Sequence, residues 1–450
     1  MEWLGDVVVG PEVETAHEIL EGRTKRLRPE TVDEHSVLAL LDLVIALLRA
    51  MVDPDDGVVH DWNLDRWNDI ELRQLLKDHG GSPEIVDHWS GLRMIYDSTF
   101  QYRGGDPRQP DFAAGTGTRA MLRTMTTYKG SVLYHLAAGA GEMVISPLYE
   151  VLKSRGVRFA FFHDVEHLHV HRGRVRGVRI RQQADNTGFE PTFVHNGLVS
   201  WPHRSGVPGE LERRWGRPEG VGTLTLREGQ DFDDIVLAIP LGALRHRNIC
   251  DELRVHEPFG RMLDAPSLVP TASLQLWMNS SLSELGWERR TPALVGWTHP
   301  LSVWAEMSHL LRHEEGEFGS LHYLCGPLDT DLYTSEESPV LRARTLARLR
   351  ILKQLERDPP WPSKELPADH YLRVNIDPSE CVVRSPAGSV AMRLAPSESG
   401  FGNLALAGAW TRTGVDASSV ESAVMSGMQA ARHLSGEDIE VVGEGFMGPG

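Results

Sequence analysis

The hydrophobic pattern is clearest near the C-terminus, where a short apolar run precedes a long amphipathic segment. Leu404 to Ala407 is an uninterrupted apolar run that ends at Gly408, which predicts a buried strand and a turn. After a polar loop, small or apolar residues recur at helical spacing, at Val420, Ala423, Val424, Gly427, Met428 and Ala431. Because this face is mostly small, we expect another element to approach the helix backbone closely. Ser418 and Glu421 have the spacing of a capping box, which predicts that the helix begins there.

The N-terminal region has a helical pattern. Thr31 to Met51 predicts a strongly apolar helix with an acidic first turn. Its apolar part, Val37 to Met51, is too short to span a bilayer and contains Asp42, so no membrane span is expected. A docking or lipid-facing role for this helix stays open as an alternative.

The middle of the chain predicts strands. His167, His169 and His171 alternate on one strand face, and three imidazoles on one face are a possible zinc site. However, the strand runs into an Arg172-Gly173 turn and continues as a mate from Arg174 to Ile180, so we interpret the segment as a solvated hairpin and assign no metal site. Beyond it, three aromatics lie on strand-like sequence and are expected to be mostly core, at Trp297, Trp304 and Tyr323.

Composition narrows the class of protein. The 450 residues can form two domains with sizeable cores, and 46 basic against 63 acidic residues give a formal net charge of −17. This charge disfavours nucleic acid or an anionic membrane surface as a partner. The three cysteines, Cys250, Cys325 and Cys381, are far apart and predict a reducing, cytoplasmic location without disulfides. The N-terminus has no basic region followed by an apolar core, so no signal peptide is expected.

The strand, glycine turn and helix from Gly402 to Arg432 resemble the C-terminal flavin-binding motif of the FAD-dependent amine oxidase and phytoene desaturase superfamily. Further segments resemble the same superfamily in the same order: Ala138 to Glu142, Pro147 to Val157, Phe159 to Val165, Phe232 to Leu244, Trp304 to Leu310 and Tyr371 to Glu380. The resemblance covers about residues 110 to 435. It implies FAD as cofactor, with Val165 at the adenine and Gly408, Ala409, Trp410, Ser419 and Val420 at the flavin.

One part of the family pattern is missing. The family opens with a strand, a Gly-x-Gly-x-x-Gly turn and a helix that holds the pyrophosphate, and nothing in the first hundred residues fits it. The literal match at Gly443 to Gly448 has no helix after it and is interpreted as part of a flexible tail. A sheet without that central strand exposes backbone edges and apolar faces. We therefore expect a smaller partner chain that bears the Gly-x-Gly-x-x-Gly unit; the alternatives are that FAD is not bound or that the native chain is longer.

These observations predict an α/β fold class, with an α+β substrate domain and an incomplete Rossmann-like FAD domain completed by the partner chain. Residues 1–110 are expected to be the helical N-terminal part of the substrate domain, and residues 437–450 a flexible tail. The FAD domain is expected to comprise residues 111–180, 230–245 and 395–436, and the rest of the substrate domain residues 181–229 and 246–394.

The resemblance implies a larger subunit of a two-chain oxidoreductase that transfers a hydride from a C–N or C–C bond of a small-molecule substrate to flavin; no catalytic side chain is assigned. One departure favours an alternative. After the glycine the family usually has Asp or Glu, whose carboxylate accepts hydrogen bonds from the ribityl chain, and this sequence has Ala409. The alternative is a catalytically silent scaffold that stabilises or tunes a partner flavoenzyme.

Overall fold

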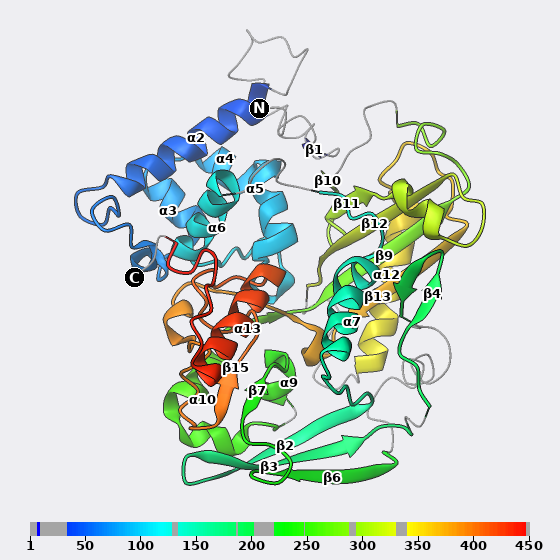
Figure 1. The fold of residues 1–450 in the computed structure, drawn as a ribbon. Coiled ribbons are helices and arrows are strands. Elements are labelled where there is room, and N and C mark those ends of the chain that lie inside the picture. The colour runs from blue at the N-terminus through cyan, green and yellow to red at the C-terminus, as the bar shows by residue number, and fades with distance from the viewer. Residues whose placement is uncertain are drawn as a thin grey trace.

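The computed structural model describes residues 7–9, 34–127, 134–185, 188–201, 220–246, 248–287, 294–329 and 340–446. Helices are mixed with parallel and antiparallel strands, which confirms the predicted α/β class (Figure 1). The buried apolar side chains of the described residues form three clusters, one around N-terminal helices and two around sheets.

The first cluster is helical. It lies among α2 (Glu34–Met51), α3 (Leu72–Asp78), α4 (Pro83–His88), α5 (Ser90–Ile95) and α6 (Ala114–Thr126). The predicted helical character of this region is thereby confirmed. The same cluster contains Val415, Ala417 and Met425 from the C-terminal part of the chain. The N-terminal helices thus share their core with a segment that the sequence assigned to the FAD domain; the domain boundaries themselves stay a prediction.

Helix α2 has two apolar faces. Ala39, Ala46 and Ala50 are buried, whereas Leu41 and Leu48 are among several large side chains that stay exposed. No helix in the described residues is long and apolar enough to cross a membrane. The exposed face keeps a docking role for α2 open.

The second cluster lies against a six-stranded sheet. Its strand order is β1 (Val7–Val9), β10 (Leu294–Gly296), β11 (Val303–Glu306), β12 (Ser320–Pro327), β9 (Thr271–Met278) and β13 (Asp369–Asn375). Helix α12 (Val340–Arg357) contributes Ala347, Ile351 and Leu355 to this cluster. Trp297 and Trp304 are also buried in it, so their expected core role is confirmed.

The third cluster joins two small sheets. One is the antiparallel sheet of β2 (His163–His171), β3 (Arg174–Gln182) and β6 (Gly222–Arg227), which confirms the predicted hairpin. The other is the parallel pair of β7 (Ile235–Leu237) and β15 (Leu404–Leu406). Helices α9 (Leu241–His246) and α10 (Glu257–Asp264) pack against both.

Two helices that matter for the site, α7 (Ser146–Ser154) and α13 (Val420–Ser435), lie on either side of the centre of the molecule in Figure 1. Four short strands complete the described sheets: β4 (Phe193–His195), β5 (Leu198–Ser200), β8 (Leu268–Val269) and β14 (Val382–Val383). Short 3-10 and π turns connect the elements: η2 (Leu64–Trp67), η3 (Tyr96–Phe100), η4 (Arg103–Gly105), η5 (Gly141–Ile145), η6 (Asp251–Val255), η7 (Ser308–His313), η8 (Pro378–Glu380) and η9 (Val390–Met392).

The expected open sheet edges are found at only one of the two parallel strands. On β15 the edge away from β7 is occupied, because Leu406 N donates to the Pro396 carbonyl at 2.8 Å and the Ser399 hydroxyl donates to the Leu404 carbonyl. The prediction of an exposed edge was therefore wrong for β15, whose backbone groups find partners within the chain. In the described part of the chain, β7 pairs with β15 alone.

The C-terminal segment is packed, which corrects the expectation of a flexible tail for residues 437–446. Val441 is buried in the first cluster, and Glu444 pairs with Arg432 at 2.6 Å. Arg123 of α6 donates to the Gly443 carbonyl at 3.1 Å. A buried valine and two arginine contacts fix this segment against α6 and α13; residues 447–450 lie outside the described residues.

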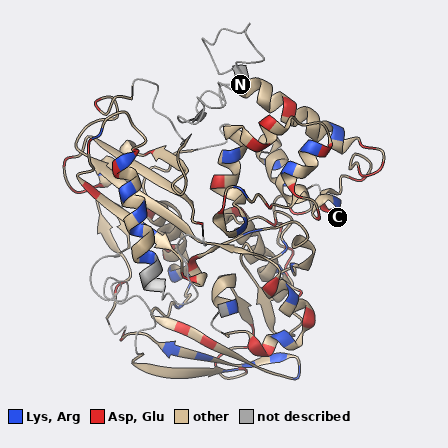
Figure 2. Ribbon diagram, turned by 180° about the vertical axis from the view of Figure 1, so that it is seen from behind, with Lys and Arg blue, Asp and Glu red and all other residues tan. Residues whose placement is uncertain are grey.

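Charge is unevenly distributed over the elements. Figure 2 shows a row of basic residues along α12, whereas the other described helices carry fewer charged residues. Two arginines of this row are used inside the fold. Arg348 donates to the Leu372 carbonyl of β13 at 2.9 Å, and Arg344 pairs with Glu380. These contacts tie α12 to the strand beneath it.

The two faces of α13 allow a test of which one supports the fold. Met425 is 4% exposed and Val424 is 54% exposed. We expect Met425→Ala to lower the free energy of unfolding by about 2–5 kcal/mol, because it leaves a cavity in the first cluster. Val424→Ala is the control and is expected to change it by less than about 0.5 kcal/mol. Urea denaturation of the chain purified alone measures both, and similar effects would contradict the assignment of faces.

Candidate functional site

The candidate site is built on β15 and the turn that follows it. Leu404, Ala405 and Leu406 are buried, and the strand pairs in parallel with β7. Ala407 N donates to the Leu237 carbonyl at 3.0 Å, which extends the pairing to the residue before Gly408. Gly408 therefore lies at the end of the buried parallel pair of β7 and β15, where ligand sites in α/β proteins commonly form.

The Gly408 turn is held by hydrogen bonds within the chain. Gly408 N donates to Ser426 Oγ of α13 at 2.7 Å, and its carbonyl accepts from Thr411 N at 3.1 Å and Thr411 Oγ1 at 2.9 Å. Its φ is +140°, and a Cβ there would lie 2.4 Å from Trp410 Nε1. A side chain at 408 is strained by this φ and would also overlap the Trp410 ring, so both the backbone and the indole favour glycine.

A buried arginine anchors the loop after the turn. Arg393 Nη1 donates to the Ala409 carbonyl at 2.7 Å, and Arg393 Nη2 donates to Ser385 Oγ at 2.7 Å. Burial lowers the pKa of the Arg393 guanidinium, and the Asp416 carboxylate opposes this shift. The Ala409 carbonyl is thus occupied by a side chain of the same chain.

Asp416 closes the loop from the other end. Its Oδ1 accepts from Thr413 N at 2.9 Å, and its Oδ2 lies 3.5 Å from Arg119 Nη1 of α6. Asp416 itself is 2% exposed with a φ of +56°. Two buried arginines and a carboxylate therefore fix the path from the turn to the helix.

Helix α13 begins one residue later than the capping box predicts. Ser419 is the N-cap, and its Oγ accepts from Ser422 N at 3.0 Å. Glu421, now in the first turn of the helix, pairs with Arg123 at 2.9 Å.

The predicted buried face of α13 is largely exposed. Its buried residues are Ser422, Met425, Ser426 and Ala430, whereas Val420 and Val424 are 73% and 54% exposed. A Cβ at Gly427 would meet no atom within 4 Å in this structure. In the described residues this face is largely uncovered, so the expectation that something approaches it closely stays a prediction.

The six residues expected at the cofactor are only partly brought together. Gly408, Ala409 and Trp410 form the turn, and Ser419 with Val420 forms the helix start beyond the anchored loop. Val165 lies on β2, and it packs against the third cluster, which also contains Trp410. The Trp410 ring is 3% exposed. The structure thus places it in the core, and its contact with a cofactor stays a prediction, as do those of the other five.

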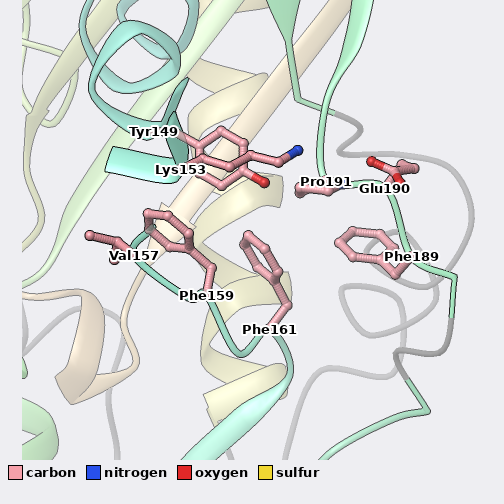
Figure 3. Close-up of a pocket in the computed structure, with 8 residues that line it drawn as sticks. All are labelled: Tyr149, Lys153, Val157, Phe159, Phe161, Phe189, Glu190 and Pro191. Atoms are coloured by element: carbon pink, nitrogen blue, oxygen red, sulfur yellow. The ribbon is translucent and has the colours of Figure 1, made fainter. Parts of the chain in front are cut away.

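A separate cavity lies between α7 and the segment that enters β2. It has a volume of about 290 Å³ and is lined by Tyr149, Lys153, Val157, Phe159, Phe161, Phe189, Glu190 and Pro191. Figure 3 shows aromatic rings along it, with Lys153 and Glu190 coming from different segments at its rim. The Tyr149 and Phe159 rings are 4.7 Å apart. This aromatic-walled space contains none of the six residues expected at the cofactor, although five of its lining residues lie in the family-like segments 147–157 and 159–165.

The buried side chains that hold the turn escaped the sequence analysis. Arg393, Ser426 and Asp416 anchor the loop, yet none was expected to do so, although Asp416 and Ser426 lie inside the motif from Gly402 to Arg432. One signal was present for Ser426: it lies four residues after Ser422 and next to Met425, on one helix face. No such signal exists for Arg393.

A buried parallel pair, a glycine turn and a capped helix are typical of a cofactor-binding α/β protein. The chain belongs to the flavin-containing amine oxidoreductase family, because the sequence model of that family matches residues 210–435, half of the chain. Membership confirms the resemblance, the amine oxidoreductase function of the family and FAD as the cofactor. A search of the curated proteins found no match.

Solved structures agree at the level of the fold. An oxidoreductase from Methanosarcina mazei has a TM-score of 0.51 at 9% identity, over 92% of this chain and 77% of that one. Cyclohexylamine oxidase from Brevibacterium oxydans has a TM-score of 0.49 at 12% identity, over 91% of this chain and 75% of that one. A putrescine oxidase variant has a TM-score of 0.48 at 12% identity, over 89% and 75% of the two chains.

The residues at the turn fit one end of FAD and not the other. The α13 N-terminus is exposed at Val420, so the positive end of its dipole is accessible to an electron-rich ring. In the described ranges, however, no strand, Gly-x-Gly-x-x-Gly turn and helix are found in succession. The literal match near the C-terminus is used structurally, since the Gly443 carbonyl accepts from Arg123. This chain could therefore hold the flavin edge but offers no phosphate-binding turn among its described residues.

Two glycines give a matched test of the turn. Gly408→Ala is expected to lower the free energy of unfolding by about 1–3 kcal/mol, because the methyl group overlaps the Trp410 ring. Gly427→Ala, in the open helix interior, is expected to raise it by about 0.5–1 kcal/mol. Urea denaturation of the chain purified alone gives both values. Equal tolerance at the two sites would show that Trp410 does not constrain Gly408.

Proposed function

We propose that this chain is the larger subunit of a two-chain FAD-dependent amine oxidoreductase that acts in the cytoplasm. A smaller chain would supply the Gly-x-Gly-x-x-Gly unit that binds the FAD pyrophosphate. The observation that carries the proposal is the uncovered face of α13, next to a flavin-type turn in a chain without its own phosphate-binding turn among the described residues.

The α13 face has the character of an interface. Val420, Ala423, Val424, Gly427 and Ala431 are small or apolar, and an uncovered face of this kind permits close approach of a second helix backbone. Exposed contiguous apolar patches commonly mark association sites in soluble proteins. A helix that follows a phosphate-binding glycine turn is a partner of the required shape.

Helix α7 offers a second uncovered face. Only Ser146 and Tyr149 of this helix are buried. Leu148, Val151 and Leu152 are 55%, 47% and 40% exposed, and Ile145 before the helix is 52% exposed. A nine-residue helix with so little of its apolar surface covered gains stability when a partner packs on it.

The occupied edge of β15 limits how a partner can join. Pro396 and Ser399 already satisfy the groups of that edge. A strand from the partner would therefore pair with the outer edge of β7 or displace the segment from Pro396 to Ser399. The helix faces can be covered without any such rearrangement, so we propose that they form the main contact.

The domain assignment is part of this proposal. Residues 111–180, 230–245 and 395–436 would face the cofactor, and residues 181–229 and 246–394, with the six-stranded sheet, would face the substrate. Within these ranges the following residues lie outside the described ones: 128–133, 186–187, 202–219, 247, 288–293 and 330–339.

When bound, FAD accepts a hydride equivalent from a C–N or C–C bond of the substrate. The amine chemistry in the family's description favours a C–N bond and an amine substrate. The contribution of this chain is electrostatic and positional. The N-terminus of α13, capped by Ser419, stabilises negative charge at its exposed end, and the loop fixed by Arg393 and Asp416 holds that end in place.

A catalytically silent scaffold is the second candidate. Ala409 favours it, because this position lacks the carboxylate that is usual after the glycine and its carbonyl is already bonded to Arg393. The visible spectrum of the complex purified with its natural partner distinguishes the two candidates. Flavin absorption that is bleached by an amine substrate supports the enzyme, and a colourless complex supports the scaffold.

Expressed alone, the chain is expected to carry little FAD and to be poorly soluble, so that it aggregates at all but low concentrations, because apolar helix faces on α2, α7 and α13 are uncovered. In the co-expressed complex, Val424→Asp is expected to reduce both partner recovery and flavin content at least about tenfold, since it buries a charge in the interface. Val255→Asp, at a valine that is 80% exposed elsewhere, is the control and is expected to change neither. A yellow, monodisperse preparation of the single chain would refute the two-chain enzyme.

Position 409 tests whether the site is degenerate. Ala409→Asp restores the family's carboxylate and is expected to keep or tighten FAD affinity in the complex, through a charge-assisted hydrogen bond of about 1.5–3 kcal/mol. Ala409→Asn has the same size without the charge and separates crowding from electrostatics. Titration of the apo complex with FAD measures all three proteins. If the Asp and Asn variants both lose about tenfold in affinity, equal to about 1.4 kcal/mol, the site has been rebuilt around alanine.

A further inference from the structure

Two histidines and a carboxylate converge at the edge of β2, in the lower part of Figure 1. His167 and His169 alternate on the strand, and Glu252 comes from η6. His167 Nε2 lies 2.9 Å and His169 Nδ1 lies 3.3 Å from the same oxygen, Glu252 Oε1. The possible ligand atoms of the three residues all lie within 4.8 Å of one another.

These separations are close to those of a metal site. A tetrahedral zinc ion with ligands at about 2.1 Å has neighbouring ligand atoms about 3.4 Å apart. The two measured distances to Glu252 Oε1 are 2.9 and 3.3 Å, so small side-chain rotations are enough to admit an ion. The donors are two imidazole nitrogens and one carboxylate oxygen, a set that suits zinc and similar divalent transition metals and not calcium or magnesium.

The carboxylate is held in position by the strand itself. Glu252 Oε2 accepts from Val170 N at 2.5 Å, which leaves Oε1 directed at the two imidazoles. A second backbone contact, from Leu168 N to the Ile249 carbonyl at 3.0 Å, fixes β2 against the segment that leads into η6. Anchoring of this kind by an outer hydrogen bond is typical of metal-binding carboxylates.

The carboxylate of the cluster is ionised, and all three side chains are partly open to solvent. The hydrogen bond from Val170, with those from the two histidines, lowers the pKa of Glu252 to about 2, so this ligand is charged at neutral pH. The side chains of His167, His169 and Glu252 are 19%, 45% and 39% exposed. An ion bound here has an entry path and room for water as its remaining ligand.

We propose that His167, His169 and Glu252 bind a divalent transition-metal ion, with Zn²⁺ the best match and water in the remaining coordination position. The ion would link β2 to η6, two segments that are 85 residues apart between His167 and Glu252. His171, the third histidine considered from the sequence, is exposed and outside the group. The site contains none of the residues expected at the flavin, so the metal proposal does not depend on the proposed function.

Metal titration of the full chain, together with its partner where the two co-purify, tests the site. After removal of metal with EDTA, Zn²⁺ is followed by calorimetry and Co²⁺ by its visible absorption. The wild type is expected to bind one ion with micromolar or tighter affinity. His167→Ala and Glu252→Gln are expected to weaken binding at least about tenfold. His171→Ala is the matched control on the same strand and is expected to bind as the wild type does.

Circular dichroism and thermal melting distinguish the loss of a metal ligand from the loss of folded structure. Glu252→Gln retains a carbonyl oxygen for the Val170 amide, so its far-ultraviolet circular dichroism is expected to match that of the wild type. Zn²⁺ is expected to raise the melting temperature of the wild type and of His171→Ala but not of Glu252→Gln, since only a native-state site stabilises by mass action. Absence of micromolar binding in the wild type would show that the cluster is a histidine–glutamate ion pair only. Equal binding by all four proteins would place the ion at other histidines, and either result overturns the proposal.

Discussion

The packing of α13 is the interaction on which the rest of this structure depends. One face of the helix holds the turn after β15, through the bond from Gly408 N to Ser426 Oγ, and inserts Met425 into the core of the N-terminal helices. Arg123 of α6 bonds the first turn of α13 at Glu421 and the tail at Gly443. Segments from the N-terminal helices and from the C-terminal part of the chain therefore meet on the same side of one helix. Because that side is fully used within the chain, the opposite side is the one left for another molecule.

Periodicity identified α13 and its preceding turn but not the face that packs within the chain. The pattern ranks valine, alanine and glycine as buried and serine as exposed. Ser422 and Ser426 are nevertheless fully buried, because their hydroxyls bond Thr413 and the Gly408 amide. A short hydroxyl with a satisfied hydrogen bond costs little to bury, whereas a valine with no neighbour stays exposed. At the N-cap, two adjacent serines are equally suitable locally, and the structure uses Ser419.

Long-range side-chain contacts were beyond prediction from the sequence. Arg393 bonds the Ala409 carbonyl across 16 residues, and Glu252 reaches the Val170 amide across 82. Neither residue belongs to a local motif, and their roles depend on how separate segments meet. The hairpin of β2 and β3 was predictable because its turn and alternation are local. The closed edge of β15 was not, because it is closed by an irregular segment from Pro396 to Ser399 that has no strand pattern.

The absence of a Gly-x-Gly-x-x-Gly unit among the described residues creates two requirements, and this chain meets only one of them. A chain that lacks a central strand must satisfy the backbone groups beside the gap and also cover the apolar side chains there. At β15 the first requirement is met within the chain, whereas on α7 and α13 the second is not. In the proposed two-chain enzyme, the partner therefore contributes mainly apolar burial.

The free energy that the partner gains by covering these apolar side chains is small, and this affects how the cofactor is held. Ile145, Leu148, Val151, Val420 and Val424 are each 47–73% exposed, and burying the rest of such a side chain contributes about 1 kcal/mol. The sum, about 5 kcal/mol, is at the low end of the entropic cost of association. These contacts alone would give a weak complex. In the proposed enzyme, one chain would bind the phosphates of FAD and the other its flavin edge. The cofactor therefore adds contacts that neither chain makes alone, and FAD would stabilise the assembly. Because binding and assembly are thermodynamically linked, the assembly would in turn retain FAD.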